Sequence, residues 1–139
     1  MKLVILDTNV LLDIFVFNDF RAIHLRQALL EKRIDALATP NTLAEFADVI
    51  SRPLFSLAPD TQANIMAQWQ SLARAMADES LLLAPWQCQD PDDQVFLNLA
   101  YTARPSVLIS KDNEILKLAS KAAKEHIQIT DSYNAATEL

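Results

Sequence analysis

Two acidic residues of this 139-residue chain stand directly after short apolar runs. Asp7 follows the run Leu3–Leu6, and Asp112 follows the run Val107–Ser110 after one intervening lysine. Each run has the length and composition of a buried strand. Ligands bind at the carboxyl ends of the strands in an open parallel sheet, where the loops converge. We therefore expect both carboxylates to face the same edge of the sheet.

Two further acids fall on predicted helices. Asp90 and Pro91 are typical of the N-cap and the first position of a helix, and Asp93 then heads the inward apolar stripe of that helix. Glu45 lies nearly opposite the apolar stripe of its own helix, so it either lines a cleft or faces water. Structural roles stay open for the others, because Asp90 and Asp112 are good N-caps and a first-turn acid such as Asp93 is favoured by the helix dipole.

Convergence of these acids would need a counter-ion. Like charges a few ångströms apart repel by ~4 kcal/mol per pair at intermediate dielectric. A set of oxygen ligands without nitrogen or sulfur suits a hard cation such as Mg²⁺ or Mn²⁺. Such a cation could orient and activate water and stabilise charge on a phosphodiester, so no covalent nucleophile would be required.

The composition limits the possible classes of protein. The length fits a single domain spanning residues 1–139, and no apolar run approaches a membrane span. The lone cysteine, Cys88, favours a reducing cytoplasm. The chain has no glycine, which excludes the glycine-rich phosphate loops. The net charge of -6 disfavours broad binding to nucleic acid, unless cations neutralise the acids where they gather.

Short apolar runs alternate with longer amphipathic segments. The predicted strands are Leu3–Leu6, Ile34–Ala38, Leu81–Ala84, Val107–Ser110 and Ile127–Ile129. The predicted helices are Val10–Val16, Asp19–Arg33, Asn41–Ser51, Thr61–Asp78, Pro91–Arg104, Asn113–Lys124 and Ser132–Glu138. This alternation predicts an α/β fold with a parallel sheet covered by helices.

Four motifs, in order and at this spacing, resemble the PIN-domain ribonuclease family. They are Leu6-Asp7-Thr8-Asn9-Val10-Leu11, Glu45 in a helix after Thr39-Pro40, Asp90-Pro91-Asp92-Asp93-Gln94-Val95-Phe96-Leu97, and Ile109-Ser110-Lys111-Asp112. The resemblance covers nearly the whole chain. More narrowly, the motifs are similar to those of the branch that forms the toxin components of toxin–antitoxin systems. That branch usually has arginine where this chain has Gln89 and asparagine where it has Gln94.

The resemblance implies a PIN-like (Rossmann-like) α/β/α three-layer sandwich with a central, mainly parallel sheet of about five strands. It implies a Mg²⁺- or Mn²⁺-dependent endoribonuclease that cleaves RNA, often as a homodimer, and a cognate antitoxin protein as partner if the chain is a toxin. It assigns a set of catalytic and metal-binding acids and a set of supporting polar residues. The first set is Asp7, Glu45, Asp93 and Asp112, and the second is Thr8, Asn9, Ser110 and Asp90.

Lys117, Lys121 and Lys124 have the spacing of one basic stripe on the helix after Asp112, and with Lys111 they could contact the RNA backbone. A solvated helix face explains the stripe as well. Two other functions stay open. One is a metal-dependent phosphatase or phosphotransfer domain, although Thr8 and Asn9 follow Asp7 where those folds want a further acid. The other is a non-catalytic interaction module on the same fold.

Overall fold

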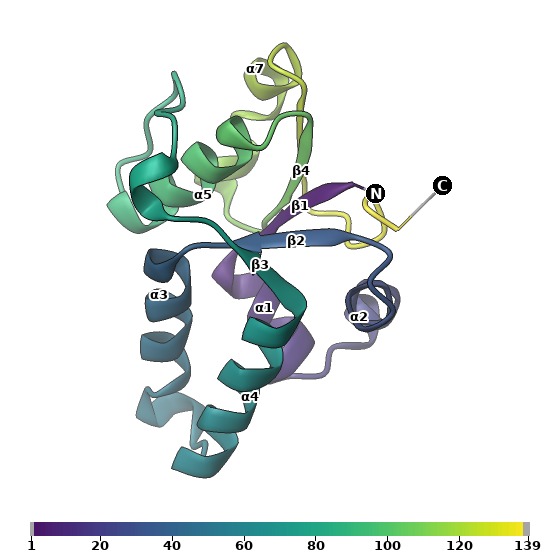
Figure 1. Ribbon diagram of the computed structural model, residues 1–139, viewed down its shortest axis with the longest axis vertical. Helices are drawn as coiled ribbons and strands as arrows, with labels where there is room; N and C mark the ends of the chain where they lie inside the picture. The colour runs from purple at the N-terminus through teal and green to yellow at the C-terminus, as the bar shows by residue number, and fades with distance from the viewer. Residues whose placement is uncertain (1, 138–139) are drawn as a thin grey trace.

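A five-stranded parallel sheet forms the centre of the computed structural model, which describes residues 2–137 (Figure 1). The strand order is β3-β2-β1-β4-β5, and every neighbouring pair is parallel. The strands are β1 (Leu3–Leu6), β2 (Asp35–Ala38), β3 (Ala73–Ala75), β4 (Ser106–Ile109) and β5 (Ile127–Thr130). The chain is thus an α/β protein with an all-parallel sheet, as the alternation of elements predicts.

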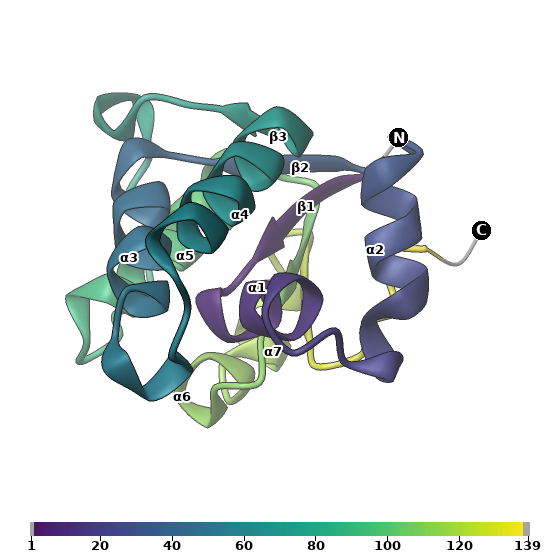
Figure 2. The ribbon, with the colours of Figure 1, turned by 90° about the horizontal axis from the view of Figure 1, so that it is seen from below.

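Helices cover both faces of the sheet. Helices α1, α2, α3 and α4 pack on one face, and α5, α6 and α7 pack on the other, which Figures 1 and 2 show from two directions. The helices are α1 (Thr8–Phe15), α2 (Ile23–Leu30), α3 (Pro40–Ile50), α4 (Pro59–Leu72), α5 (Pro91–Thr102), α6 (Asn113–Leu116) and α7 (Ala119–Ala123). Three 3₁₀ turns, at Phe20–Ala22, Pro53–Phe55 and Asp78–Ser80, join some of them.

The central strand β1 separates two hydrophobic cores. Val4 and Leu6 belong to the core under α1–α4, whereas Ile5 belongs to the core under α5–α7. All three side chains are almost fully buried, because successive residues of a strand point to opposite faces and both faces are covered. The uninterrupted apolar run before Asp7 therefore marks a central strand, and the strand end is held firmly in place.

The predicted strand Leu81–Ala84 is wrong. The third strand is Ala73–Ala75, so the fourth helix ends at Leu72 and does not reach Asp78. The segment from Leu82 to Cys88 instead bonds side chains on α5. The amide N–H groups of Leu82, Ala84 and Cys88 donate to the side-chain oxygens of Thr102, Asn98 and Gln94, over 2.8, 2.9 and 2.7 Å respectively. These side chains satisfy backbone groups that a neighbouring strand would otherwise pair.

Two other predicted helices differ in the structure. The segment Asn113–Lys124 is broken at Lys117 and Leu118 into the short helices α6 and α7. Residues 133–137 form turns and not a helix, and Glu138, the end of that predicted helix, lies outside the described residues. The other predicted helices and strands are present, with ends shifted by a few residues. The helix predicted over Asp19–Arg33 is a 3₁₀ turn followed by α2. No helix in the described part is long and apolar enough to cross a membrane.

Candidate active site

Asp7 lies at the carboxyl end of the central strand and is the N-cap of α1. It is only 4% exposed. Its Oδ1 atom accepts a hydrogen bond from the Thr8 backbone N–H at 2.7 Å, and its Oδ2 atom accepts from Asn9 Nδ2 at 3.2 Å. Burial raises the pKa of Asp7 and the Asp112 charge adds to that rise, against hydrogen bonds that favour the ionised form. The carboxylate is thus fixed in orientation and short of positive charge.

Ser110 joins the two acids that follow strands β1 and β4. Its Oγ atom donates to Asp7 Oδ2 at 2.5 Å and accepts from the backbone N–H of Asp112 at 3.0 Å. Asp112 is also the N-cap of α6, where its Oδ1 accepts from the Glu114 N–H at 2.9 Å. The predicted common edge for Asp7 and Asp112 is therefore present, and the predicted capping role of Asp112 is present as well.

Glu45 reaches this edge from α3. Its Oε2 atom accepts a 2.8 Å hydrogen bond from the hydroxyl of Thr8, the residue after Asp7. The side chain is half-buried, and that burial raises the pKa of Glu45, as do the charges of Asp92, Asp7 and Asp90. Of the two possibilities left open by the helical pattern, the fully solvated face is wrong, because the side chain is half-buried against Thr8.

Asp93 completes the group from the first turn of α5. Burial raises its pKa to about 7, together with a hydrogen bond to the Asp112 carboxyl and the charges of Asp112, Asp7 and Asp90. It is half-buried rather than exposed, as the inward register of its helix predicts, and it lies near enough to Asp112, Asp7 and Asp90 for their charges to act on it. Asp90 is exposed and caps α5, accepting from the Asp92 N–H at 2.9 Å, so the structure gives it the capping role.

The donor chemistry of the group fits a hard divalent cation. All four side chains offer carboxylate oxygens, and the pKa values of Asp7, Glu45 and Asp93 are raised, which a bound cation would reverse. Within residues 2–137, no three side chains of aspartate, glutamate, histidine or cysteine come together closely enough to hold a metal ion as they stand. The Ser110 hydroxyl links Asp7 to the backbone of Asp112, and Thr8 bonds both Asp7, through its N–H, and Glu45, through its hydroxyl.

A charged network beside the acids was not predicted from the sequence. Asp13, on α1, is 3% exposed and accepts hydrogen bonds from Lys111 Nζ at 2.6 Å and Tyr133 Oη at 2.5 Å. The backbone N–H of Lys111 donates to Asn9 Oδ1 at 3.3 Å. The signal in the sequence was an aspartate inside the apolar pattern Val10–Phe15, a position that requires a buried partner.

The predicted basic stripe is not formed as predicted. The break between α6 and α7 puts Lys117 on a different helix from Lys121, so their spacing no longer defines one continuous helical face. Lys117 pairs with Glu114, its Nζ lying 2.5 Å from the carboxylate. Lys111 points to Asp13, as described above.

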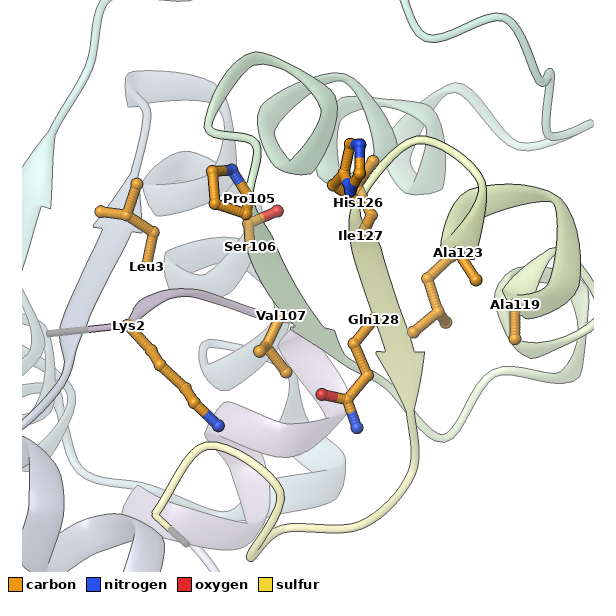
Figure 3. Close-up of a pocket in the computed structure, with 11 residues that line it drawn as sticks. Lys2, Leu3, Pro105, Ser106, Val107, Ala119, Ala123, His126, Ile127 and Gln128 are labelled. Atoms are coloured by element: carbon orange, nitrogen blue, oxygen red, sulfur yellow. The ribbon is translucent and has the colours of Figure 1, made fainter. Parts of the chain in front are cut away.

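A large cavity lies away from the acids. About 750 Å³ in volume, it opens at the amino ends of β1, β4 and β5, where Leu3, Pro105 and His126 line it (Figure 3). The acids stand at the opposite, carboxyl ends of the same strands. The mostly apolar lining also has no carboxylate, so this cavity does not belong to the acidic site.

An all-parallel α/β sheet with acids gathered at its carboxyl edge is an architecture that nucleases share with other α/β enzymes. The chain matches the PIN domain family over residues 3–114, which include all four acids. It therefore belongs to the PIN domain family, whose members are generally nucleases that typically use divalent metals. No curated protein matched the chain significantly.

Proposed function

We propose that this protein is a metal-dependent endoribonuclease in which Asp7, Glu45, Asp93 and Asp112 hold Mg²⁺ or Mn²⁺. The observation that carries the proposal is the linkage of acids from four separate elements at one strand edge. Ser110 ties Asp7 to the backbone of Asp112, Thr8 bonds Glu45, and Asp93 lies close enough to Asp112 for that carboxyl to raise its pKa. In the PIN family this edge is the place where such chemistry is expected.

The protein's own side chains would orient the reaction. Ser110, Asn9 and the Thr8 N–H hold the Asp7 carboxylate so that it offers charge in one direction. Thr8 does the same for Glu45. A bound divalent cation supplies activation of water and stabilisation of charge on the phosphodiester. Asp93 would hold the cation as a carboxylate, and because its pKa without metal is about 7, metal binding near neutral pH would displace a proton from it.

The toxin role is a finer part of the proposal. It rests on the resemblance of the motifs to the toxin branch. In this reading the substrate is RNA, the protein acts in the cytoplasm, a cognate antitoxin silences it, and a homodimer is the active form. Co-expression with a small neighbouring gene product, followed by co-purification and a growth assay, would test this part separately.

Cleavage of a labelled single-stranded RNA with Mn²⁺, Mg²⁺ or EDTA tests the central proposal. We expect cleavage with either metal, none with EDTA, and a loss of ~100-fold or more in Asp112→Asn. Asp48→Asn is a matched control, because Asp48 is an exposed acid on α3 whose partner is Arg52. A single-stranded DNA of the same sequence tests the preference for RNA. Equal rates for the two aspartate variants would refute the proposed site.

A further inference from the structure

A second cavity lies beside the acids, at the carboxyl edge of the sheet. It has a volume of about 430 Å³, within the ~300–1,000 Å³ range of ligand pockets. Its walls come from the turn after α1, the loop after β4 and the segment after β5. Residues of the connection between α1 and α2 and residues of this last segment line the cavity together. The lining combines two cationic side chains, one carboxylate, an amide and three rings, namely Arg21, Lys111, Asp131, Asn134, Phe20, His24 and Tyr133.

Lys111 connects this cavity to the acidic site. Its backbone N–H bonds Asn9 Oδ1 at 3.3 Å, and Asn9 Nδ2 bonds Asp7 Oδ2 at 3.2 Å. The next residue along the chain is Asp112. A chain of nucleotides that places a phosphodiester at Asp7 and Asp112 would therefore run past Lys111, and a neighbouring nucleotide would reach the cavity.

The basic groups of the cavity keep hydrogen-bond donors available. An ammonium group has three N–H donors, and the hydrogen bonds of Lys111 Nζ within residues 2–137 use one of them, on Asp13. Arg21 bonds Asp19 through Nε and Nη2, which leaves Nη1 without a partner in that same part of the chain. The aspartates hold both cations in place at the rim, and their remaining donors suit a phosphate.

Phe20 supplies the other half of a nucleotide site. Its side chain is 78% exposed, although a phenyl ring gains by burial. Exposed aromatic rings are the surfaces on which unpaired bases stack, without regard to base identity. An aromatic ring and free cationic donors lining one cavity match the two halves of a nucleotide.

We propose that this cavity binds a nucleotide of single-stranded RNA adjacent to the scissile phosphodiester, with its base stacked on Phe20 and its phosphate on Lys111 and Arg21. The inference rests on the proposed nuclease function, which places the RNA strand across the acidic site and so next to this cavity. It commits to a single strand because bases inside a duplex are stacked on one another and cannot reach Phe20.

Equilibrium binding without metal tests this proposal apart from cleavage. Fluorescence anisotropy of a labelled single-stranded RNA in EDTA would compare wild type, Phe20→Leu and Phe20→Trp. We expect Phe20→Leu to bind about tenfold more weakly and Phe20→Trp to bind as wild type, because leucine is apolar but cannot stack on a base. The indole fluorescence of the Phe20→Trp variant should be quenched by RNA beyond any quenching seen in wild type. Duplex RNA should bind more weakly than the single strand.

Phe17→Leu is the matched control, since Phe17 is 57% exposed, packs on Phe55 at 5.9 Å and does not line the cavity. Equal affinity of Phe20→Leu and wild type, equal loss in Phe20→Leu and Phe17→Leu, or no RNA binding by wild type would each overturn the proposal. Cleavage by wild type with Mn²⁺ is measured separately. Cleavage with no effect of Phe20 refutes the cavity alone, whereas a Phe20 effect without any cleavage refutes the nuclease function and leaves the binding site standing.

Discussion

Ser110 Oγ donates a 2.5 Å hydrogen bond to Asp7 Oδ2 across 103 residues of sequence. The same oxygen accepts the N–H of Asp112, so one hydroxyl sets both acids relative to each other. Its position follows from the pairing of β1 with β4, which aligns Leu6 with Ile109. Parallel pairing in this register brings the residues after both strands together at one edge.

Asp7→Asn should separate activity from stability. We expect RNA cleavage to fall by ~100-fold or more, because the substitution removes charge while keeping size and hydrogen-bonding shape. Without metal the melting temperature should hold or rise, since burial and the Asp112 charge already disfavour the ionised form of Asp7. Rates from a single-turnover assay and melting curves in EDTA would show both effects. A well-folded Asp7→Asn protein that cleaves at the wild-type rate would contradict the assignment.

Stability without metal should fall as the pH rises from about 4 to about 7. The folded pKa of Asp93 is raised from 3.8 to about 7, so the native state binds the proton more tightly than the unfolded chain over this range. The unfolded state then binds fewer protons, and the free energy of unfolding decreases with pH. The stability that the protonated Asp93 side chain contributes is present in full below its unfolded pKa and is lost as the pH rises through its folded pKa.

Mn²⁺ should reverse that loss. The gain in melting temperature on adding the metal should therefore be larger at about pH 8 than at about pH 5. In Asp93→Asn the pH dependence should flatten, whereas Asp48→Asn should behave as wild type. Identical metal-induced gains at both pH values would mean that these acids do not share a cation.

Asp13 and Lys111 should show strong coupling in a double-mutant cycle. Lys111→Met should lower the free energy of unfolding by about 2 kcal/mol, since it leaves the buried Asp13 carboxylate with Tyr133 and the more distant Arg21 but without its nearest cation. Adding Asp13→Asn should restore part of the loss, because the uncompensated charge is gone. Urea unfolding of the four proteins gives the coupling energy. Strictly additive losses would show that the pair contributes nothing beyond its separate residues.

Lys32→Gly should stabilise the fold slightly. Lys32 has φ 55°, in the left-handed region, where a side chain costs about 1–2 kcal/mol, while glycine loses about 0.4–1 kcal/mol through the freer unfolded chain. The expected net gain is about 0.5 kcal/mol in urea unfolding. Asn18→Gly is the contrast: Asn18 has φ 48°, but its Oδ1 accepts a 2.8 Å hydrogen bond from Arg26. That variant should show no gain, and equal gains at both positions would argue against the strain at Lys32.

Features carried by neighbouring residues could be predicted from the sequence. The apolar run before Asp7 is a central strand because it is buried on both faces, and no tertiary detail changes that pattern. Capping by Asp90 and Asp112 is equally local, because each carboxylate accepts a hydrogen bond from the backbone N–H two residues further along the chain. The inward register of Asp93 follows from the period of its own helix.

Features that depend on a partner distant in the sequence were decided by the tertiary structure. The segment Leu82–Cys88 is apolar at its start, as a strand would be, yet it is not part of the sheet because side chains of α5 take its amides. Glu45 was ambiguous on its own helix until Thr8 supplied a hydroxyl across 37 residues. The buried charge of Asp13 needed Lys111 and Tyr133, both about a hundred residues away. Local patterns determine which residues form a strand, a cap or the core. A long-range polar pair forms only where folding brings its two members together, and no local pattern contains that information.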